Sequence, residues 1–314
     1  MYIGVMTKTA MIEIRNYRMQ FGSNTVIDNL SFEVQAGETF AFLGSNGSGK
    51  TTTIRTLLGI FEPTAGTLLV KGRRYTPAMS PLLGYLPEER GLYKKESVLE
   101  TMLYFGRLKR MPVAAARRWS IDYLERVGLA DKAKVPLEKL SGGQQQKIQL
   151  GVTIMNDPEL MILDEPTKGF DPVNRRLLMD IVEEHSRRGA TVVLVTHQME
   201  EVERLCNRIL LLKDGRRRLY GTVDDIRSQY GVPVIDVDFG GSFPRRHQTF
   251  TVSQLGKRSA ELQPVGTASP HEVLQELAGH PKLGLTKFAL RQSSLDDIFV
   301  QIYQEPASPV EVQA

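Results

Sequence analysis

The chain has 314 residues, of which 41% are hydrophobic and 24% are charged, as in an ordinary globular protein. The net charge of +4 is small for this length and argues neither for nor against a polyanionic partner. The single cysteine, Cys206, excludes an intrachain disulfide and a multi-cysteine metal site, and we expect a buried structural thiol there. No apolar run approaches the ~18–20 residues that span a bilayer, and residues 1–10 lack a signal-peptide core.

Basic residues are clustered at three places: 73–74, 117–118 and 216–218. We expect these clusters to be solvated surface, with contact to a membrane surface as the weaker alternative. Residues 1–10 are predicted to be an N-terminal extension to the first folded domain.

The first strongly patterned segment ends in a loop that is typical of phosphate binding. Residues 11–18, 26–34 and 38–43 are predicted strands, and the last of them runs into Gly44–Thr51, which fits G-x-x-x-x-G-K-[ST]. Apolar residues of a helix follow at once, so strand, loop and helix occur in the required order. The residues expected to bind nucleotide here are Ser45, Asn46, Gly47, Ser48, Gly49, Lys50, Thr51 and Thr52.

Lys50 can reach the outer phosphates, and the Thr51 hydroxyl can bind Mg²⁺. Upstream of the loop, Phe21 follows the first predicted strand. An aromatic ring there could stack on adenine or pack in the core, and the residues alone leave both open.

The middle of the chain changes from strands to helices. Residues 82–93 begin as a strand that breaks at Pro87, and residues 98–108 and 114–127 have helical spacing. This pattern predicts a mostly helical insertion, at about residues 94–155. Its aromatic stripe of Trp119 and Tyr123 is more often core than a binding site. Ser141 is a plausible N-cap of the last helix of this region.

Acidic and histidine side chains then follow two predicted strands. Asp164 and Glu165 end the strand at residues 160–163, and His197 follows the strand at residues 191–195. The carboxyl ends of parallel strands form the ligand-binding edge of a doubly wound sheet. Asp164 can hold Mg²⁺, Glu165 can orient an attacking water, and His197 can contact a terminal phosphate.

Five features in one order resemble the ATP-binding cassette (ABC) ATPase family: GSNGSGKT, LSGGQ, LMILDEP, GFDP at residues 169–172, and His197. The resemblance covers about residues 11–221. It implies an α/β P-loop ATPase core with a helical insertion, in which Lys50, Glu165 and His197 are catalytic. It also places Phe21 on adenine and implies that Ser141 and Gly143 contact ATP on the opposite subunit of a dimer.

Three residues depart from the family pattern. Glu88 stands where the family commonly has Gln, and Lys168 and Phe170 replace the usual Ser and Leu. The block GYLPEERGLY at residues 84–93 is similar to that of a subgroup of ABC exporters with Glu at this position. We therefore expect Glu88 to join Thr51 and Asp164 at the metal, and the change at Phe170 to be mild.

Residues 222–305 are predicted to form a small accessory α+β domain with an antiparallel sheet, followed by a tail at residues 306–314. The ending Ser294-Leu295-Asp296-Asp297-Ile298-Phe299 is similar to the C-terminal domain of the same exporter subgroup. No set of residues in this part has a catalytic pattern.

The resemblance implies a homo- or heterodimeric ATPase subunit of an exporter that uses ATP and Mg²⁺. It would act on membrane-spanning permease subunits carried by separate chains, at the cytoplasmic face of the cell membrane. The alternative is a soluble ABC ATPase acting on nucleic acid or ribosomes. Such proteins usually carry two cassettes, a long coiled-coil insertion or zinc modules, and we expect no nucleic-acid partner here.

Overall fold

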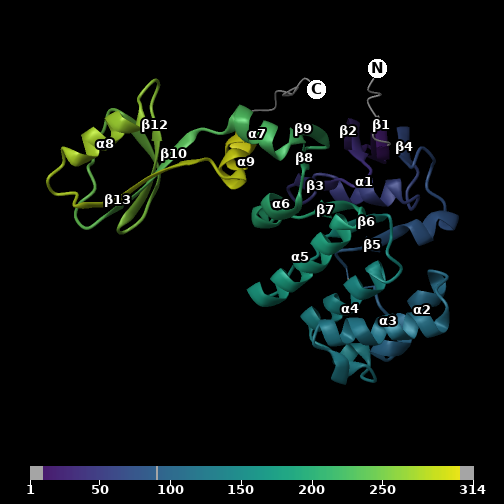
Figure 1. The fold of residues 1–314 in the computed structure, drawn as a ribbon. Helices are drawn as coiled ribbons and strands as arrows, with labels where there is room; N and C mark the ends of the chain where they lie inside the picture. Colours follow the sequence, from purple (N-terminus) through teal and green to yellow (C-terminus); the bar gives the residue numbers. More distant parts are fainter. Residues whose placement is uncertain (1–9, 90, 305–314) are drawn as a thin grey trace, which may run out of the picture. The chain divides into compact units, whose positions relative to one another are not determined.

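The computed structural model describes residues 10–89 and 91–304. The expected N-terminal extension, apart from Ala10, and the expected tail at residues 306–314 lie outside these residues. The chain divides into two compact units between Thr222 and Val223 (Figure 1).

The central sheet of the first unit has six strands in the order β5-β6-β7-β3-β8-β9. Its first five strands in that order are parallel, and β9 is antiparallel to β8. Nearly continuous apolar runs form the inner strands because both faces of the sheet are covered. The strands are β3 (Thr39–Gly44), β5 (Leu83–Leu86), β6 (Leu160–Asp164), β7 (Thr191–Val195), β8 (Arg208–Lys213) and β9 (Arg216–Thr222).

A smaller antiparallel sheet, in the order β2-β1-β4, shares one core with this sheet and with helix α1. Phe32 stacks on Phe40 with ring centroids 5.5 Å apart, and the buried Tyr17 hydroxyl lies 2.8 Å from Thr56 Oγ1. This packing fixes the base of α1 against both sheets. The elements are β1 (Ala10–Phe21), β2 (Asn24–Gln35), β4 (Ala65–Val70) and α1 (Lys50–Leu57).

The predicted helical insertion is a group of three packed helices (Figure 1). Tyr123 is buried and donates to the Lys147 carbonyl at 2.6 Å, and Trp119 stacks on it, so this stripe is core, as predicted. The helices are α2 (Val98–Leu108), α3 (Val113–Arg126) and α4 (Gly142–Ile154). The 3₁₀ helices η2 (Ala130–Lys132) and η3 (Leu137–Lys139) lie between α3 and α4, whereas η1 (Pro77–Leu82) precedes β5 of the central sheet.

Helices α5 (Pro172–Arg187) and α6 (Met199–Leu205) follow β6 and β7. Cys206, directly after α6, is free and buried as expected, and burial raises the pKa of its thiol. Residues 216–218 begin β9, and the solvated surface predicted for them fits Arg216, whose side chain is 70% exposed, but is wrong for Arg218. Arg218 is only 5% exposed, and Arg217 donates to the Ser31 carbonyl at 3.0 Å. Pairing with the buried strand β8 turns part of this basic run inward.

The second unit is the expected α+β domain. Its antiparallel sheet has the order β11-β12-β10-β13, and Ile235, Val237 and Leu262 pack with Val273 and Leu277 of α8. The strands are β10 (Pro233–Phe239), β11 (Phe250–Leu255), β12 (Ser259–Pro264) and β13 (Leu285–Gln292), and the helices are α7 (Val223–Tyr230), α8 (Pro270–Ala278) and α9 (Leu295–Gln304).

No helix in the part of the chain that the structure describes is long and apolar enough to cross a bilayer.

Candidate active site

The predicted phosphate loop joins β3 to α1 in the expected way. Gly44, Gly47 and Gly49 have φ values of 154°, 80° and 108°, in the region that favours glycine. A Cβ atom on Gly44 would lie 2.4 Å from the backbone oxygen of Leu212, so both space and backbone conformation require glycine there. The loop thus brings backbone groups close together at the N-terminus of α1, where anions are favoured.

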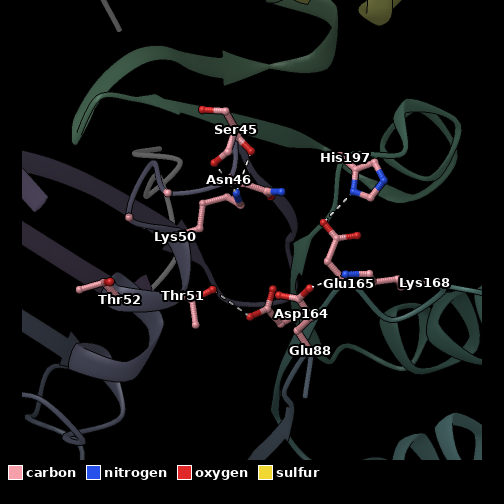
Figure 2. A pocket seen from close by; sticks show the side chains of 13 residues that line it. Ser45, Asn46, Lys50, Thr51, Thr52, Glu88, Asp164, Glu165, Lys168 and His197 are labelled. Atoms are coloured by element: carbon pink, nitrogen blue, oxygen red, sulfur yellow. Dashed lines mark hydrogen bonds and ion pairs between the residues drawn. The ribbon is translucent and has the colours of Figure 1, made fainter. Parts of the chain in front are cut away.

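This loop forms one wall of a cavity of about 590 Å³. The opposite wall comes from the segments that follow β5, β6 and β7, because the carboxyl ends of these parallel strands meet at one edge of the sheet (Figure 2). The lining contains predicted site residues together with Gly44 and Lys168, which were not predicted as site residues. It consists of Gly44, Ser45, Asn46, Gly47, Gly49, Lys50, Thr51, Thr52, Glu88, Asp164, Glu165, Lys168 and His197.

Lys50 projects from the first turn of α1 along the loop. Its ammonium donates to the carbonyls of Gly44 at 2.7 Å and Ser45 at 3.0 Å. Burial lowers the pKa of Lys50, and the nearby carboxylates of Glu165 and Asp164 oppose this effect. The two carbonyls therefore hold the end of this side chain at the mouth of the loop.

Thr51 and Asp164 face each other at the floor of the cavity. The Thr51 hydroxyl donates to Asp164 Oδ2 at 3.3 Å, and Asp164 is only 2% exposed at the end of β6. Burial first, and then the charge of Glu88, raises the pKa of Asp164 to about 6.

These two residues supply hard oxygen donors, which suit Mg²⁺. No cluster of three or more acidic, histidine or cysteine side chains that could enclose a metal occurs among residues 10–89 and 91–304. Mg²⁺ is commonly held by one or two protein oxygens together with phosphates and waters, so the pair fits this ion.

Glu165 and His197 form the second wall. Glu165 Oε1 lies 2.9 Å from His197 Nδ1, and the Glu165 amide donates to the Val195 carbonyl at 2.8 Å (Figure 2). Glu165 has a φ of 50°, a left-handed conformation that costs a non-glycine residue about 1–3 kcal/mol. The fold holds this strained residue so that its carboxylate points into the cavity beside the histidine.

Glu88 and Lys168, the two polar departures from the family pattern, contact each other on the wall of the cavity opposite the phosphate loop. Lys168 Nζ lies 2.7 Å from Glu88 Oε1. The hydrogen bond and charge of Glu88 raise the pKa of Lys168. Nothing in the local sequence around either residue predicted this contact, because 80 positions separate them.

Two residues that were predicted to bind the nucleotide held by this same chain do not line the cavity. Phe21 is 45% exposed and meets Phe61 edge to face at 5.5 Å between ring centroids, so it is not a core residue. Ser48 is buried beneath the loop, where its amide donates to the Ser45 carbonyl at 3.1 Å. The Phe21 ring is therefore available at the surface, whereas Ser48 is a buried residue that stabilises the loop itself.

Ser141 and Gly143, at the start of α4, also lie outside the lining of this cavity. Ser141 caps the helix by accepting from the Gln144 amide at 3.3 Å. A Cβ atom on Gly143 would lie 3.2 Å from the Phe170 ring, so the side chain that departs from the family pattern packs directly on this glycine.

Sequence reasoning missed a buried carboxylate that lies behind Glu165 and His197. Glu201 of α6 is 2% exposed, and it accepts hydrogen bonds from Thr167 and, at 3.0 Å, from Thr196. These threonines follow Glu165 by two residues and precede His197 by one. Burial raises the pKa of Glu201. An acidic residue in an amphipathic helix gives no sign that it turns inward.

A glycine-rich loop between a strand and a helix, with an acidic pair at the end of a neighbouring strand, defines a P-loop nucleoside triphosphatase. Comparisons with known proteins narrow this class. Residues 27–168 match the family model described as ABC transporter, and residues 221–303 match the model described as ATP-binding protein DrrA1-3-like, C-terminal domain.

Relatives match nearly the whole chain. YhaQ of Bacillus subtilis, described as an uncharacterized ABC transporter ATP-binding protein, is 35% identical over 93% of this chain and 98% of its own. The Nod factor export ATP-binding protein I of Cupriavidus metallidurans is 33% identical over 94% of this chain and 97% of its own. A solved ATP-binding subunit of an ABC transporter has a TM-score of 0.66 at 29% identity, covering 70% of this chain and 93% of the other.

The chain therefore belongs to the ATP-binding proteins of ABC transporters. It is an ATPase with the fold predicted from its motifs, and ATP is the nucleotide of its family. All of these matches are to transporter proteins, which favours the transporter interpretation over the nucleic-acid alternative.

Proposed function

We propose that this protein is the Mg²⁺-dependent ATP-hydrolysing subunit of an ABC exporter. The observation that carries the proposal is the convergence of Lys50, Asp164, Glu165 and His197 on one cavity at the carboxyl edge of the sheet. A cation, a buried carboxylate and a carboxylate–histidine pair are the groups that hydrolysis of a phosphate anhydride requires.

Binding of the triphosphate falls to the loop and to Lys50. The Lys50 ammonium exchanges its two carbonyl partners for phosphate oxygens, and Phe21 offers an exposed ring for the adenine. Thr51 and Asp164 would hold Mg²⁺, with Glu88 as a further ligand. The bound ion neutralises phosphate charge and orients the terminal phosphate.

Glu165 is the residue that accepts the proton of the attacking water. Its carboxylate points into the cavity, and the contact with His197 Nδ1 fixes its orientation. The exposed His197 ring can reach the terminal phosphate through Nε2, which would exchange its 3.1 Å contact with Gln198 Nε2 for a phosphate oxygen. General base assistance of this kind contributes about 10²–10⁴-fold to a rate.

A second ATPase subunit completes the site in this proposal. Ser141 and Gly143 do not line the cavity of their own chain, and the capped N-terminus of α4 can present amide groups to phosphates held by a partner. Two chains arranged head to tail would enclose two ATP molecules. Both a homodimer and a heterodimer meet this requirement.

The transport role requires membrane-spanning permease subunits on separate chains, and it places the protein peripherally at the cytoplasmic face of the cell membrane. The relative named for Nod factor export supports the direction of transport. Closing and opening of the ATPase dimer would drive these partners.

A Glu165→Gln variant tests both halves of the proposal. Because it lacks the proton acceptor, it should hydrolyse ATP about 10²–10⁴-fold more slowly than the wild type while still binding ATP. With Mg-ATP present, the tagged variant should co-purify from detergent-solubilised membranes with a polytopic membrane protein in fixed stoichiometry, identified by mass spectrometry.

Glu159→Gln is the matched control, since Glu159 is an exposed residue at the other end of β6 that pairs with Lys71. Its turnover should equal that of the wild type. Normal turnover of Glu165→Gln would remove Glu165 from its role. Ribosomal or nucleic-acid partners without a membrane protein would replace the exporter with the soluble alternative.

A further inference from the structure

The ion pair between Glu88 and Lys168 connects two loops of different function. Glu88 lies two residues after the end of β5, where the chain enters the helical insertion. Lys168 belongs to the turn of Glu165, because its amide donates to the Glu165 carbonyl at 3.2 Å. A 2.7 Å contact therefore ties the entrance of the insertion to the turn that carries the carboxylate beside His197.

Helix α4 holds the backbone of both loops in place. The Gln149 side chain donates to the carbonyls of Pro87 at 3.3 Å and Glu89 at 3.1 Å, and the Gln146 side chain donates to the Pro166 carbonyl at 3.3 Å. Both glutamines are buried. The positions of Glu88 and Lys168 are thus set by a buried scaffold, although both side chains are open to solvent.

The Glu88 carboxylate lies within electrostatic reach of the groups that surround the metal position. Its charge contributes to the raised pKa of Asp164 and opposes the lowering of the pKa of Lys50. A divalent cation on Thr51 and Asp164 would therefore attract Glu88 as well. An ammonium paired with a carboxylate neutralises part of the charge that attracts a metal ion, so the two cations compete for the same carboxylate.

We propose that Lys168 competes with Mg²⁺ for Glu88, so that binding of the metal breaks the ion pair between the two loops. Lys168 is then a positioning residue that sets metal affinity. The exchange also releases the contact between the insertion and the Glu165 turn. This inference rests on the proposed function, because it requires the metal to bind with nucleotide in this cavity.

The test measures metal affinity directly. Mn²⁺ is titrated into the full-length protein saturated with the non-hydrolysable analogue AMP-PNP, and free Mn²⁺ is followed by electron paramagnetic resonance. Lys168→Gln should tighten Mn²⁺ binding about two- to fivefold, the range that corresponds to an ion pair of this exposure. Glu88→Gln should weaken it, because a ligand is lost.

The double variant separates competition from a general effect of charge. With Glu88→Gln already present, Lys168→Gln should leave Mn²⁺ affinity unchanged. An equal gain in both backgrounds, or no gain in either, overturns the inference. Lys71→Gln, which removes an exposed pair with Glu159 of similar length, should behave as the wild type. Absence of stoichiometric Mn²⁺ in the wild type would instead contradict the proposed function.

Discussion

At the scale of single residues, Asp164 has an unusual ionisation for a group in the cavity. Its carboxylate is buried at the floor of the cavity, close to Glu88, and its pKa of about 6 compares with 3.8 for an exposed aspartate. Between these two values the folded protein keeps a proton that the unfolded chain has already lost. Stability of the metal-free protein therefore falls as the pH rises from 4 to 6, and the full cost is present above 6.

Asp164→Asn removes this cost, since an amide does not ionise. In the presence of a chelator, the variant should gain about 3 kcal/mol of unfolding free energy relative to the wild type between pH 4 and pH 7, because the shift is about two pKa units. Urea unfolding at several pH values measures the difference. A difference that does not change with pH would show that Asp164 is ionised at its ordinary pKa.

Local sequence was sufficient for residues whose role follows from their own segment. The glycines and Lys50 could be placed because the loop motif fixes the path of the backbone. Asp164 could be placed because it ends a parallel strand, and the carboxyl ends of such strands form the ligand-binding edge of the sheet. The contact of Lys168 with Glu88 depends on where two distant loops meet, which no periodicity encodes. Arg218 was misjudged for the same reason, since burial of a charged strand residue depends on its neighbouring strands.

At the scale of elements, α6 connects the segments that follow β6 and β7. Glu201 accepts one hydrogen bond from Thr167 of the first segment and one from Thr196 of the second. A single buried carboxylate therefore fixes the separation of Glu165 and His197. Replacing it would leave two hydroxyls without their acceptor and would loosen this geometry.

Glu201→Ala should therefore lower kcat for ATP about 10–100-fold with little change in nucleotide affinity, because small displacements of catalytic groups have large effects on rate. Steady-state kinetics and equilibrium binding of a fluorescent ATP analogue measure the two quantities. Glu201→Gln, which keeps one acceptor oxygen, should restore part of the rate. Glu200→Ala is the matched control on the same helix, since Glu200 is exposed. A proportional loss of affinity in Glu201→Ala would contradict a positioning role.

Element order was also largely predictable, because the central strands are continuous apolar runs and the helices carry clear apolar faces. Strand β9 was the exception. Its first residues are three arginines, whose charge indicated solvated surface, and only their pairing with β8 and contacts with β2 make them part of a sheet. Strand formation by polar residues depends on the partner strand more than on composition.

At the scale of the whole molecule, the cavity is built from the first unit alone. All of its lining residues lie between Gly44 and His197, whereas the units divide after Thr222. A chain that ends at Thr222 should therefore bind a fluorescent ATP analogue with an affinity within about twofold of the full chain, because a compact unit can keep its own site.

The control for this truncation ends at Lys213 and so removes β9. That strand covers β8 and contributes Leu219 to the buried core, so its loss should lower the melting temperature and weaken nucleotide binding. Equal affinity of both shortened chains would show that β9 is dispensable. Loss of binding in the chain that ends at Thr222 would show that the second unit supports the site.

The two buried glutamines of α4 have a mechanical consequence. They are three residues apart, about 4.5 Å along the helix axis, and each holds a different loop. If the insertion swings away from the sheet, it must either carry both loops with it or leave the buried amide donors without acceptors. Each donor left without an acceptor costs about 1–3 kcal/mol of free energy. Helix α4 thus couples the two loops. Small thermal tilts of the helix leave these hydrogen bonds intact, and a larger displacement of the helix moves both loops together.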